Sequence, residues 1–202
     1  MSRKVYFNMA AGTWDEKYGT PELNRFLEDL VPCFGLKRGQ RILDAGTGTG
    51  VLVPYLSKEV GPSGSITAID YAEEMVKICI SKHSWIQNLK VEIQDVENLP
   101  YPSNSFDAVT CFGLFPHLEN RAKALSQLNR VLKKGGKLVI AHALSSSEIK
   151  AHHKDASLAV AEDKLPEEEE MNRLLKNAGF INIYIRDEPG CYLCTSNKLD
   201  DT

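Results

Sequence analysis

Short apolar runs alternate along the first two thirds of the chain with longer segments in which apolar residues recur every three or four positions. The runs, four or five residues long, predict strands over residues 41–44, 65–69, 89–93, 108–111 and 138–141. The periodic segments predict helices over about 51–60, 71–82 and 125–132. Such alternation of strands and helices is typical of βαβ units wound around a parallel sheet.

The last third of the chain departs from this pattern. Pro166 and the acidic run 167–170 predict the start of a helix, because proline fits the first turn and acidic side chains favour the positive end of the helix dipole. Two more strands, 181–185 and 192–195, follow, and the turn between them is too short for anything but an antiparallel hairpin. The pattern therefore predicts an α/β fold in which seven strands form a mostly parallel sheet with an antiparallel C-terminal hairpin.

A further helix, 21–34, precedes the first strand, and we expect residues 1–35 to form an N-terminal helical cap. The 202 residues exceed the usual size of one domain but are few for two. No repeat or low-complexity tract divides the chain. We therefore expect a single domain over residues 1–202.

Charge and composition narrow the classes of partner. The net charge of −3 gives no basic field for nucleic acid or an anionic membrane, and no apolar run approaches the roughly 20 residues that span a bilayer. The five cysteines are odd in number and scattered, which fits a reducing compartment and favours a cytoplasmic location. Cys191 and Cys194 form a C-x-x-C pair, but residues three apart on a strand point to opposite faces, so we expect no metal site there.

The strongest chemical signal is the segment Ile42–Gly50, in which an apolar strand runs into a glycine-rich loop before a helix. Glycines let a backbone turn sharply and let a ligand approach it closely, and a helix start offers unpaired N–H groups to an anion. A nicotinamide fingerprint, G-x-G-x-x-G, would need glycine where the chain has Val51. The loop instead reads D-x-G-x-G-x-G from Asp44, which leaves a nicotinamide-dependent oxidoreductase only as a less favoured alternative.

This loop resembles motif I of the class I S-adenosylmethionine (SAM)-dependent methyltransferases, and four further segments resemble the family's motifs in the expected order. They are Ile69–Asp70, Gln94–Val96, Ser105–Val109 and Leu132–Gly136. The overall pattern is most similar to the small-molecule branch that includes the C-methyltransferases of quinone and menaquinone biosynthesis. The resemblance implies a Rossmann-like, doubly wound sheet of seven strands, mostly parallel, whose antiparallel C-terminal hairpin strand matches the family's seventh strand.

The function implied by the resemblance is transfer of a methyl group from SAM to a small-molecule acceptor by in-line displacement, which releases S-adenosylhomocysteine (SAH). A SAM-binding regulatory protein without catalysis is an alternative. A nucleic-acid methyltransferase is disfavoured, because the chain reads Cys111–Leu114 after the fourth strand, where such enzymes carry an N/D-P-P-Y/F motif. Neither the identity of the acceptor nor the oligomeric state follows from the sequence.

The resemblance also assigns cofactor contacts to residues at the ends of the first four strands. Asp70 would bind the ribose hydroxyls, Asp95 the adenine amino group, and Asp44 the methionine ammonium, in part through water. The full set is Asp44, Gly46, Thr47, Gly48, Asp70, Tyr71, Met75, Asp95, Val96, Cys111 and Phe112. Structural alternatives exist, since Asp70 could cap the next helix and Tyr71 and Met75 could pack in the core. Asp107, in the fourth motif, is expected to brace the entry to its strand.

Catalysis of methyl transfer is mainly alignment of nucleophile, methyl carbon and sulfur, because the sulfonium is already activated. A general base is needed only if the acceptor keeps its proton near neutral pH. Four histidines are candidates for a catalytic or substrate-binding role: His117 after the fourth strand, His142 at the end of the fifth, and His152 and His153 beyond it. Loop packing or simple solvation is the alternative for each of them.

The connection over residues 145–165 is long, and long connections are usually functional or disordered. Ile149, His152 and His153 recur in it at helical spacing. In the family that the chain resembles, this region supplies the wall over the acceptor, so we expect a substrate lid in which His152 or His153 meets the acceptor. Residues 7–18 resemble the family's N-terminal run, which folds over the cofactor, and a docked amphipathic helix is the alternative.

Overall fold

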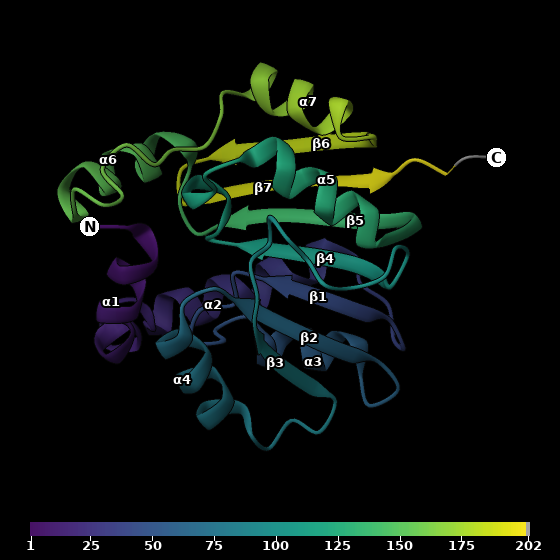
Figure 1. The fold of residues 1–202 in the computed structure, drawn as a ribbon, viewed down its shortest axis with the longest axis horizontal. Coiled ribbons are helices and arrows are strands. Elements are labelled where there is room, and N and C mark those ends of the chain that lie inside the picture. The colour runs from purple at the N-terminus through teal and green to yellow at the C-terminus, as the bar shows by residue number, and fades with distance from the viewer. Residues whose placement is uncertain (201–202) are drawn as a thin grey trace.

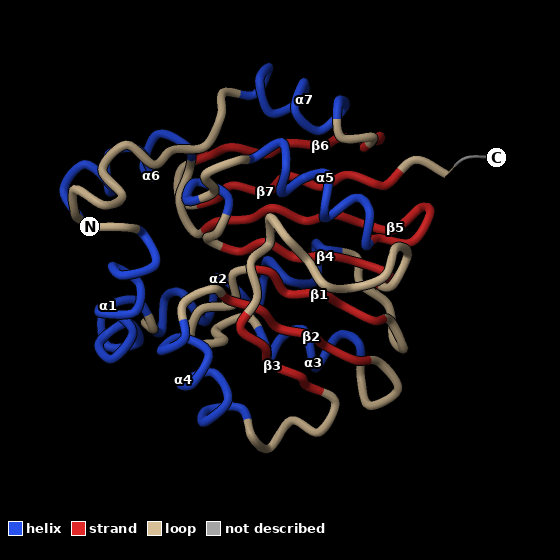
Figure 2. Tube along the Cα trace, viewed as in Figure 1, coloured by secondary structure: helices blue, strands red, loops and turns tan. Residues whose placement is uncertain are grey.

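The computed structural model describes residues 1–200, apart from the side chains of residues 155 and 156, and is built around one seven-stranded sheet (Figures 1 and 2). The strand order is β3-β2-β1-β4-β5-β7-β6. Neighbours from β3 to β5 pair in parallel, whereas β7 is antiparallel to both β5 and β6. The strands are β1 (Arg41–Ala45), β2 (Ser65–Asp70), β3 (Leu89–Ile93), β4 (Phe106–Phe112), β5 (Leu132–His142), β6 (Phe180–Glu188) and β7 (Cys191–Lys198). The predicted fold class is confirmed.

Helices cover both faces of this sheet, and the buried apolar side chains form a large cluster on each face. One cluster includes side chains of α2, α3, α4 and a 3₁₀ turn, η1, and the other includes side chains of α5 and α7. The helical elements are α1 (Arg3–Tyr18), α2 (Pro21–Leu30), η1 (Val31–Phe34), α3 (Val53–Val60), α4 (Glu73–His83), η2 (Phe115–His117), α5 (Arg121–Val131), α6 (Ser146–Ala156) and α7 (Glu168–Asn177). Both faces are thus covered by amphipathic helices, as a doubly wound sheet requires.

The C-x-x-C pair lies on β7, and its two thiols point to opposite faces of the sheet. Cys194 belongs to the cluster under α5 and α7, and Cys191 to the cluster on the other face. This agrees with the alternation of side chains along a strand. Within the described residues, no group of three or more His, Cys, Asp and Glu side chains is arranged to hold a metal ion. Across the same residues, no helix is both long and apolar enough to cross a membrane.

Strand β5 begins at Leu132 rather than at residue 138 as predicted, so residues 133–136 lie inside the strand. The partners on β5 advance there from Leu132 to Lys137, while those on β4 advance only from Phe106 to Ala108. The extra residues therefore bulge out of the ladder, which sequence periodicity does not register because the bulge needs the neighbouring strand.

Two helix boundaries also differ from the prediction. Helix α2 ends at Leu30, and the chain tightens into a 3₁₀ turn around Pro32, which has no N–H to continue the α-helical hydrogen bonds. Helix α4 begins at Glu73 rather than at residue 71. The Asp70 carboxylate accepts the N–H of Ala72 at 2.8 Å, which holds that residue in an extended conformation before the helix starts.

The connection over residues 145–165 contains α6, which agrees with the helical spacing in the sequence. Its start is fixed by a capping box in which Ser145 accepts the N–H of Glu148, and Glu148 accepts the N–H of Ser145 at 2.8 Å. The Glu148 carboxylate also accepts the N–H of Gly190 at 2.8 Å, and Ser146 N–H donates to Asp187 at 2.9 Å. Helix α6 is therefore anchored to the turn between β6 and β7.

Asp107, at the entry to β4, braces the amino-terminal edge of the sheet. Its carboxylate accepts the N–H of Arg41 at 2.8 Å and the Nζ of Lys133 at 2.6 Å, so it ties β4 to both neighbouring strands. Burial alone would raise the pKa of Asp107, but these two hydrogen bonds outweigh it and lower the pKa. The structural role expected for this residue is confirmed.

Candidate cofactor and substrate cleft

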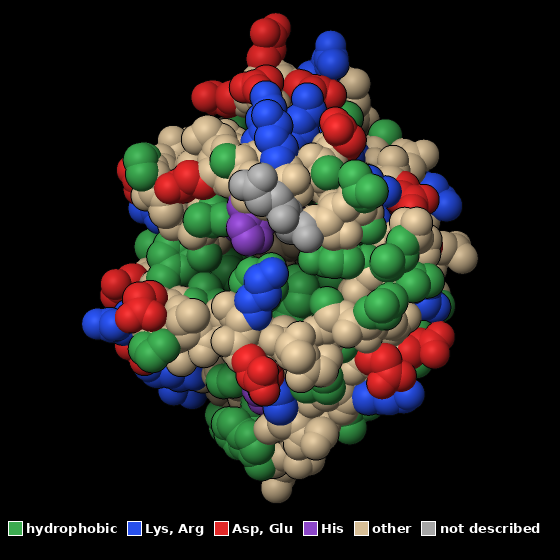
Figure 3. Space-filling model, turned by 90° about the vertical axis from the view of Figure 1, so that its left-hand side faces the viewer, with side chains coloured by type: hydrophobic (Ala, Val, Ile, Leu, Met, Phe, Trp, Pro, Cys, Tyr) green, Lys and Arg blue, Asp and Glu red, His purple; other side chains and the backbone are tan. Residues whose placement is uncertain are grey.

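The carboxyl ends of the parallel strands open into a cavity of about 800 Å³. Open α/β sheets bind ligands at this edge, and small-molecule sites have volumes of roughly 300–1,000 Å³. Residues at the ends of β1, β2, β4 and β5, residues just after β3, and residues of α1, α2 and α6 line the cavity. Figure 3 looks onto this end of the molecule, where hydrophobic side chains lie in a hollow between charged ones.

The glycine loop after β1 is held against the end of β2. The N–H groups of Gly46 and Thr47 donate to the carbonyl of Ile69 at 2.8 and 2.9 Å, and the N–H of Gly48 donates to the Asp70 carboxylate at 3.0 Å. Gly46 and Gly48 have φ angles of 71° and 56°, a region in which glycine is not strained. All three loop residues line the cavity, so a ligand can lie directly against the backbone.

Asp70 lies at the junction of this loop with α4, whose N-cap is Ala72 and which has no side-chain cap, so the capping alternative for Asp70 is wrong. One carboxylate oxygen accepts from Gly48 in the loop, the other accepts from Ala72 before α4, and the residue lines the cavity. Burial raises the pKa of Asp70, although the backbone hydrogen bonds oppose this effect. The side chain therefore links the glycine loop to the segment before α4 and is a fixed polar group at the cavity.

Asp44 and Cys111 are the two predicted cofactor residues that do not line the cavity. Asp44 is 1% exposed, and Thr110 Oγ1 donates to its Oδ1 at 2.7 Å. Its Oδ2 has no hydrogen-bond partner within the described part of the chain, and burial raises its pKa to about 6. Cys111 is buried in the core under α5. The unsatisfied oxygen of Asp44, which lies two residues before Gly46 of the glycine loop, is suited to a donor that arrives with a ligand.

The remaining predicted cofactor residues all line the cavity, on the side of β2 and β3 and at the end of β4. They are Tyr71, Met75, Asp95, Val96 and Phe112. Asp95 is held in place because its carboxylate accepts the N–H of Glu97 at 2.8 Å. Met75 is buried in a small cluster with Ala11 of α1, next to Tyr71. The structure thus brings together residues that are separated by more than sixty positions in the sequence.

Helix α1 covers one side of the cavity and is fastened there by polar contacts. Asp15 accepts from Thr49 Oγ1 and from Lys82 Nζ, both at 2.6 Å, which ties α1 to the glycine loop and to α4. Asn8 accepts the N–H of Glu74 at 2.9 Å, at the first turn of α4. Sequence reasoning placed this segment near the cofactor by resemblance, but it did not identify Asp15 as the residue that anchors it.

The four candidate histidines meet on the side of the cavity formed by β4, β5 and α6, and all four line it. The ring centroids of His117 and His153 are 4.9 Å apart, and those of His152 and His153 are 5.8 Å apart. Burial lowers the pKa of His142 to about 3, so this ring is neutral at physiological pH. Its Nδ1 is buried and has no hydrogen-bond partner among the described residues.

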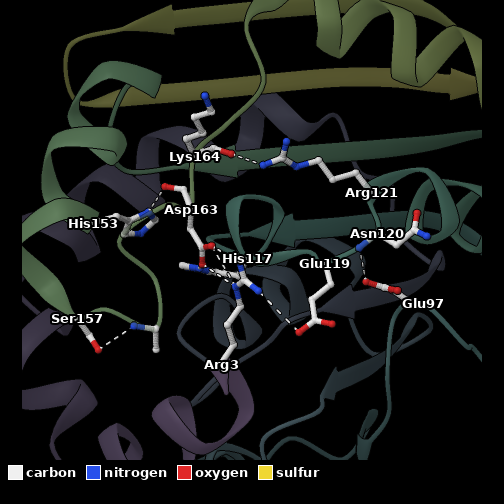
Figure 4. Close-up of polar contacts among 11 residues, drawn as sticks. Arg3, Glu97, His117, Glu119, Asn120, Arg121, His153, Ser157, Asp163 and Lys164 are labelled. Atoms are coloured by element: carbon white, nitrogen blue, oxygen red, sulfur yellow. Dashed lines mark hydrogen bonds and ion pairs between the residues drawn. The ribbon is translucent and has the colours of Figure 1, made fainter. Parts of the chain in front are cut away.

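Asp163, which was not predicted, contacts two of these histidines, His117 and His153 (Figure 4). The residue is 3% exposed, its Oδ2 lies 2.7 Å from His117 Nδ1, and both of its oxygens accept from Arg3 Nε at 3.0 Å. Its backbone carbonyl lies 2.7 Å from His153 Nδ1. In the sequence, Asp163 stands between Glu162 and Lys164, a charged run that indicates exposure, so no local signal identified it.

Comparisons with known proteins identify similar sequences and structures. Residues 36–179 match the model of a family described as a methyltransferase domain. Demethylmenaquinone methyltransferases of two Staphylococcus aureus strains, JH9 and Newman, are 33% identical to the chain in alignments that cover 82% of it and 76% of each relative.

Solved structures show the same fold. A SAM-dependent methyltransferase from Aquifex aeolicus superimposes with a TM-score of 0.69 at 29% identity, over 86% of this chain and 89% of that one. The [4+2]-cyclase SpnF gives a TM-score of 0.69 at 19% identity, over 88% and 82% of the two chains. Because a cyclase shares the fold, the fold alone does not specify the reaction, and the family match and the 33% identity carry the functional conclusion.

Proposed function

This chain belongs to the SAM-dependent methyltransferases, and we propose that its cavity divides into a cofactor half and an acceptor half. The enzyme transfers a methyl group from SAM to a small-molecule acceptor with release of SAH. A non-catalytic SAM-binding protein and a nicotinamide oxidoreductase are not favoured by this family membership. We also place the enzyme in the cytoplasm, which is supported by five cysteines that are all free thiols.

The cofactor half is the side of the cavity next to β1, β2 and β3. Gly46, Thr47 and Gly48 would face the methionine portion of SAM, with Asp44 behind them as the partner of its ammonium group. Asp70 would accept from the ribose hydroxyls, and Asp95 from the adenine amino group. What supports this assignment is the loop backbone exposed to the cavity beside two fixed carboxylates. The backbone carbonyls of Cys111 and Phe112, the backbone of Val96 and the side chains of Tyr71 and Met75 would complete the half.

A test of the cofactor half is Gly48→Ala, which should weaken SAM binding at least tenfold, or about 1.4 kcal/mol. A Cβ at Gly48 meets no atom within 4 Å, so it would project into space that the ligand needs. Gly135→Ala is the matched control, because Gly135 has a similar φ of 68°, equal open space and no contact with the cavity. Each variant should lose about 1–2 kcal/mol of stability through backbone strain. Calorimetry with SAM on both proteins separates binding from strain, and equal affinities would contradict the assignment.

The acceptor half is the side next to β4, β5 and α6, where aromatic rings and histidines alternate. Ring centroids of Phe7 and His117 are 5.0 Å apart, those of Tyr18 and His152 are 6.1 Å apart, and those of Phe112 and His142 are 6.3 Å apart. The single observation that carries our conclusion about the acceptor is this set of aromatic–histidine pairs around one cavity. Such walls favour a flat, largely apolar acceptor, because aromatic side chains bind rings by stacking and edge contacts.

The acceptor is therefore a ring-bearing small molecule. A reduced naphthoquinone, of the kind for which the Staphylococcus relatives are named, is the first candidate. Residues 145–165, with α6, would form the wall over this acceptor, and residues 1–35 would cap the cofactor within a single domain. The reaction then needs the acceptor's nucleophilic atom, the methyl carbon and the sulfur to be held in line, which rigid walls can provide.

An assay of SAH release tests the acceptor class. Naphthohydroquinone should give saturable turnover, whereas small hydrophilic amines such as glycine should give none. Phe7→Leu should raise the KM for the ring acceptor about 2- to 12-fold, the equivalent of one aromatic contact. Tyr184→Leu, an exposed aromatic on β6 outside the cavity, is the matched control and should leave KM unchanged. Turnover of glycine but not of ring acceptors would refute the proposal.

A further inference from the structure

The hydrogen bonds around Asp163 determine which nitrogen of His117 carries the proton. Asp163 is an acceptor on both oxygens, since Arg3 donates to each and His117 Nδ1 lies 2.7 Å from Oδ2. Burial alone would raise the pKa of Asp163, but the hydrogen bonds from His117 and Arg3 outweigh it and lower the pKa. A carboxylate can only accept, so His117 Nδ1 carries the hydrogen. In the neutral ring, Nε2 then holds a lone pair.

The surroundings of His117 keep that ring neutral before the acceptor binds. Burial is the main reason that the pKa of His117 is lowered, in spite of the hydrogen bond to Asp163. Charged groups that act on it include Asp163 in the segment after α6, Arg3 on α1 and His153 on α6, and the last two disfavour a proton on His117. His142 on β5 also lies close enough to interact with this ring. The positive charge of Arg3 therefore balances the carboxylate, and His117 remains able to accept a proton.

His117 also lies where an acceptor would be. It lines the cavity at the end of the loop after β4, between Phe7 at 5.0 Å and His153 at 4.9 Å from its ring centroid. His153 is held by the same segment, because its Nδ1 donates to the Asp163 carbonyl at 2.7 Å. A buried carboxylate, an oriented imidazole and an adjacent apolar site form the arrangement by which a general base is recognised.

We propose, on the basis of the acceptor half described above, that His117 Nε2 is the general base of the reaction and that Asp163 is its positioning residue. The acceptor then carries an acidic O–H group, as a phenol, hydroquinone or enol does. The base takes the O–H proton and leaves the electron pair on the acceptor. Either that oxygen or a conjugated ring carbon then bonds to the methyl carbon, while the C–S electrons pass to sulfur and give SAH. If carbon is methylated, its proton moves to the oxygen and restores the ring.

This step places the new positive charge on His117 next to a carboxylate that is already ordered to receive it. The imidazolium and Asp163 would then be 2.7 Å apart in a buried setting, where a charge-assisted hydrogen bond is stronger than a neutral one. Base catalysis of this kind contributes about 10²–10⁴ to a rate. An acceptor without an acidic proton would gain nothing from the arrangement.

A pair of ligands tests the proposal directly: 4-nitrophenol, whose ionised form absorbs in the visible, and 4-nitroanisole, which has the same ring and no proton. Both would be titrated into SAH-loaded enzyme at a pH well below the pKa of the free phenol. Wild type should bind both and show the phenolate band with the phenol. His117→Asn, in which the amide can still donate to Asp163, should bind both rings but show no phenolate band. His117→Ala serves as the second variant if the amide substitutes unexpectedly well.

Asp163→Asn tests the positioning role. The amide can donate to His117 Nδ1 and so favour the tautomer with hydrogen on Nε2, which cannot act as a base. The phenolate band should be lost, and kcat for naphthohydroquinone should fall at least tenfold with SAM affinity unchanged. For His117→Asn the fall should be about 100-fold or more. Asp107→Asn is the matched control, since Asp107 is also paired with a cation but lies outside the cavity; its band and kcat should be those of wild type.

The outcomes distinguish failure of the proposed base from failure of the proposed acceptor half. Binding of both rings with no phenolate band in wild type would overturn the base and leave the ring-binding acceptor half intact. Failure of both rings to bind would overturn the acceptor half and the base with it. A phenolate band that persists in both His117 variants would assign the base to another residue and also overturn the proposal.

Discussion

Gly50→Ala should lower the free energy of unfolding by about 2–5 kcal/mol, because two costs add at this position. The residue has a φ of 85°, a conformation that strains any side chain. An added Cβ would also lie 2.6 Å from His83 Cδ2 and 2.7 Å from Cys79 Sγ, both on the buried face of α4. Neither neighbour can move into solvent, so the glycine loop or α4 has to shift. Chemical denaturation of the SAM-free protein measures the effect.

Two comparisons separate strain from steric conflict in this experiment. Gly135→Ala, with a φ of 68° and no atom within 4 Å of its Cβ, should lose only the strain of about 1–2 kcal/mol. In a protein that already carries Cys79→Ala, the substitution at Gly50 should cost less than in wild type, because one of the conflicting atoms has been removed. A loss at Gly50 no larger than at Gly135 would show that the loop tolerates the added methyl group.

Asp70→Ala should weaken SAM binding by about 1.5–3 kcal/mol, or roughly 10- to 150-fold, the range for hydrogen bonds to a charged group. The side chain now accepts from Gly48 and Ala72 at 3.0 and 2.8 Å, so its loss also frees two backbone donors at the edge of the cavity. Calorimetry with SAM gives the affinity, and a denaturation curve of the same sample shows whether the fold has been kept.

Asp107→Ala is the control for Asp70→Ala. Asp107 is likewise a partly buried aspartate that accepts a backbone N–H, that of Arg41 at 2.8 Å, but it lies at the opposite end of the strands. Its removal should lower stability and leave SAM affinity as it was. If both variants lost SAM affinity in proportion to their loss of stability, Asp70 would have only a structural role.

The order and kind of the secondary structure elements could be derived from the sequence, because each depends on a few neighbouring residues. The segment Ile42–Ala45 is apolar except for Asp44, and the glycines that follow it adopt positive φ angles; both features are local. Asp70, an acid at the end of an apolar strand, was singled out by the resemblance to the methyltransferase motifs. The bulge at residues 133–136 could not be derived, because it is defined by pairing with β4.

The role of α1 was left open by the sequence for a related reason. The amphipathic helix given as an alternative is not what the structure has, because the apolar and polar residues of α1 do not separate onto two faces. Periodicity therefore does not say what the helix contacts. Asp15 settles its position by binding Thr49 and Lys82, which are 34 and 67 residues away along the chain. Contacts of that separation depend on how the elements are brought together, and no local pattern encodes them.

The histidine group shows most clearly which properties the sequence reveals and which depend on packing. The sequence offered His117, His142, His152 and His153 as four separate candidates, because a histidine's chemistry is visible from its residue type. It offered no reason to choose Asp163, which lies in a charged stretch yet is buried between Arg3, 160 residues away, and His117, 46 residues away. Burial and protonation are properties of the packed environment. The residue type of the proposed base was therefore visible in the sequence. The choice of His117 among the four histidines, its tautomer and its partner depend on how α1, the segment after β4 and the segment after α6 pack against one another.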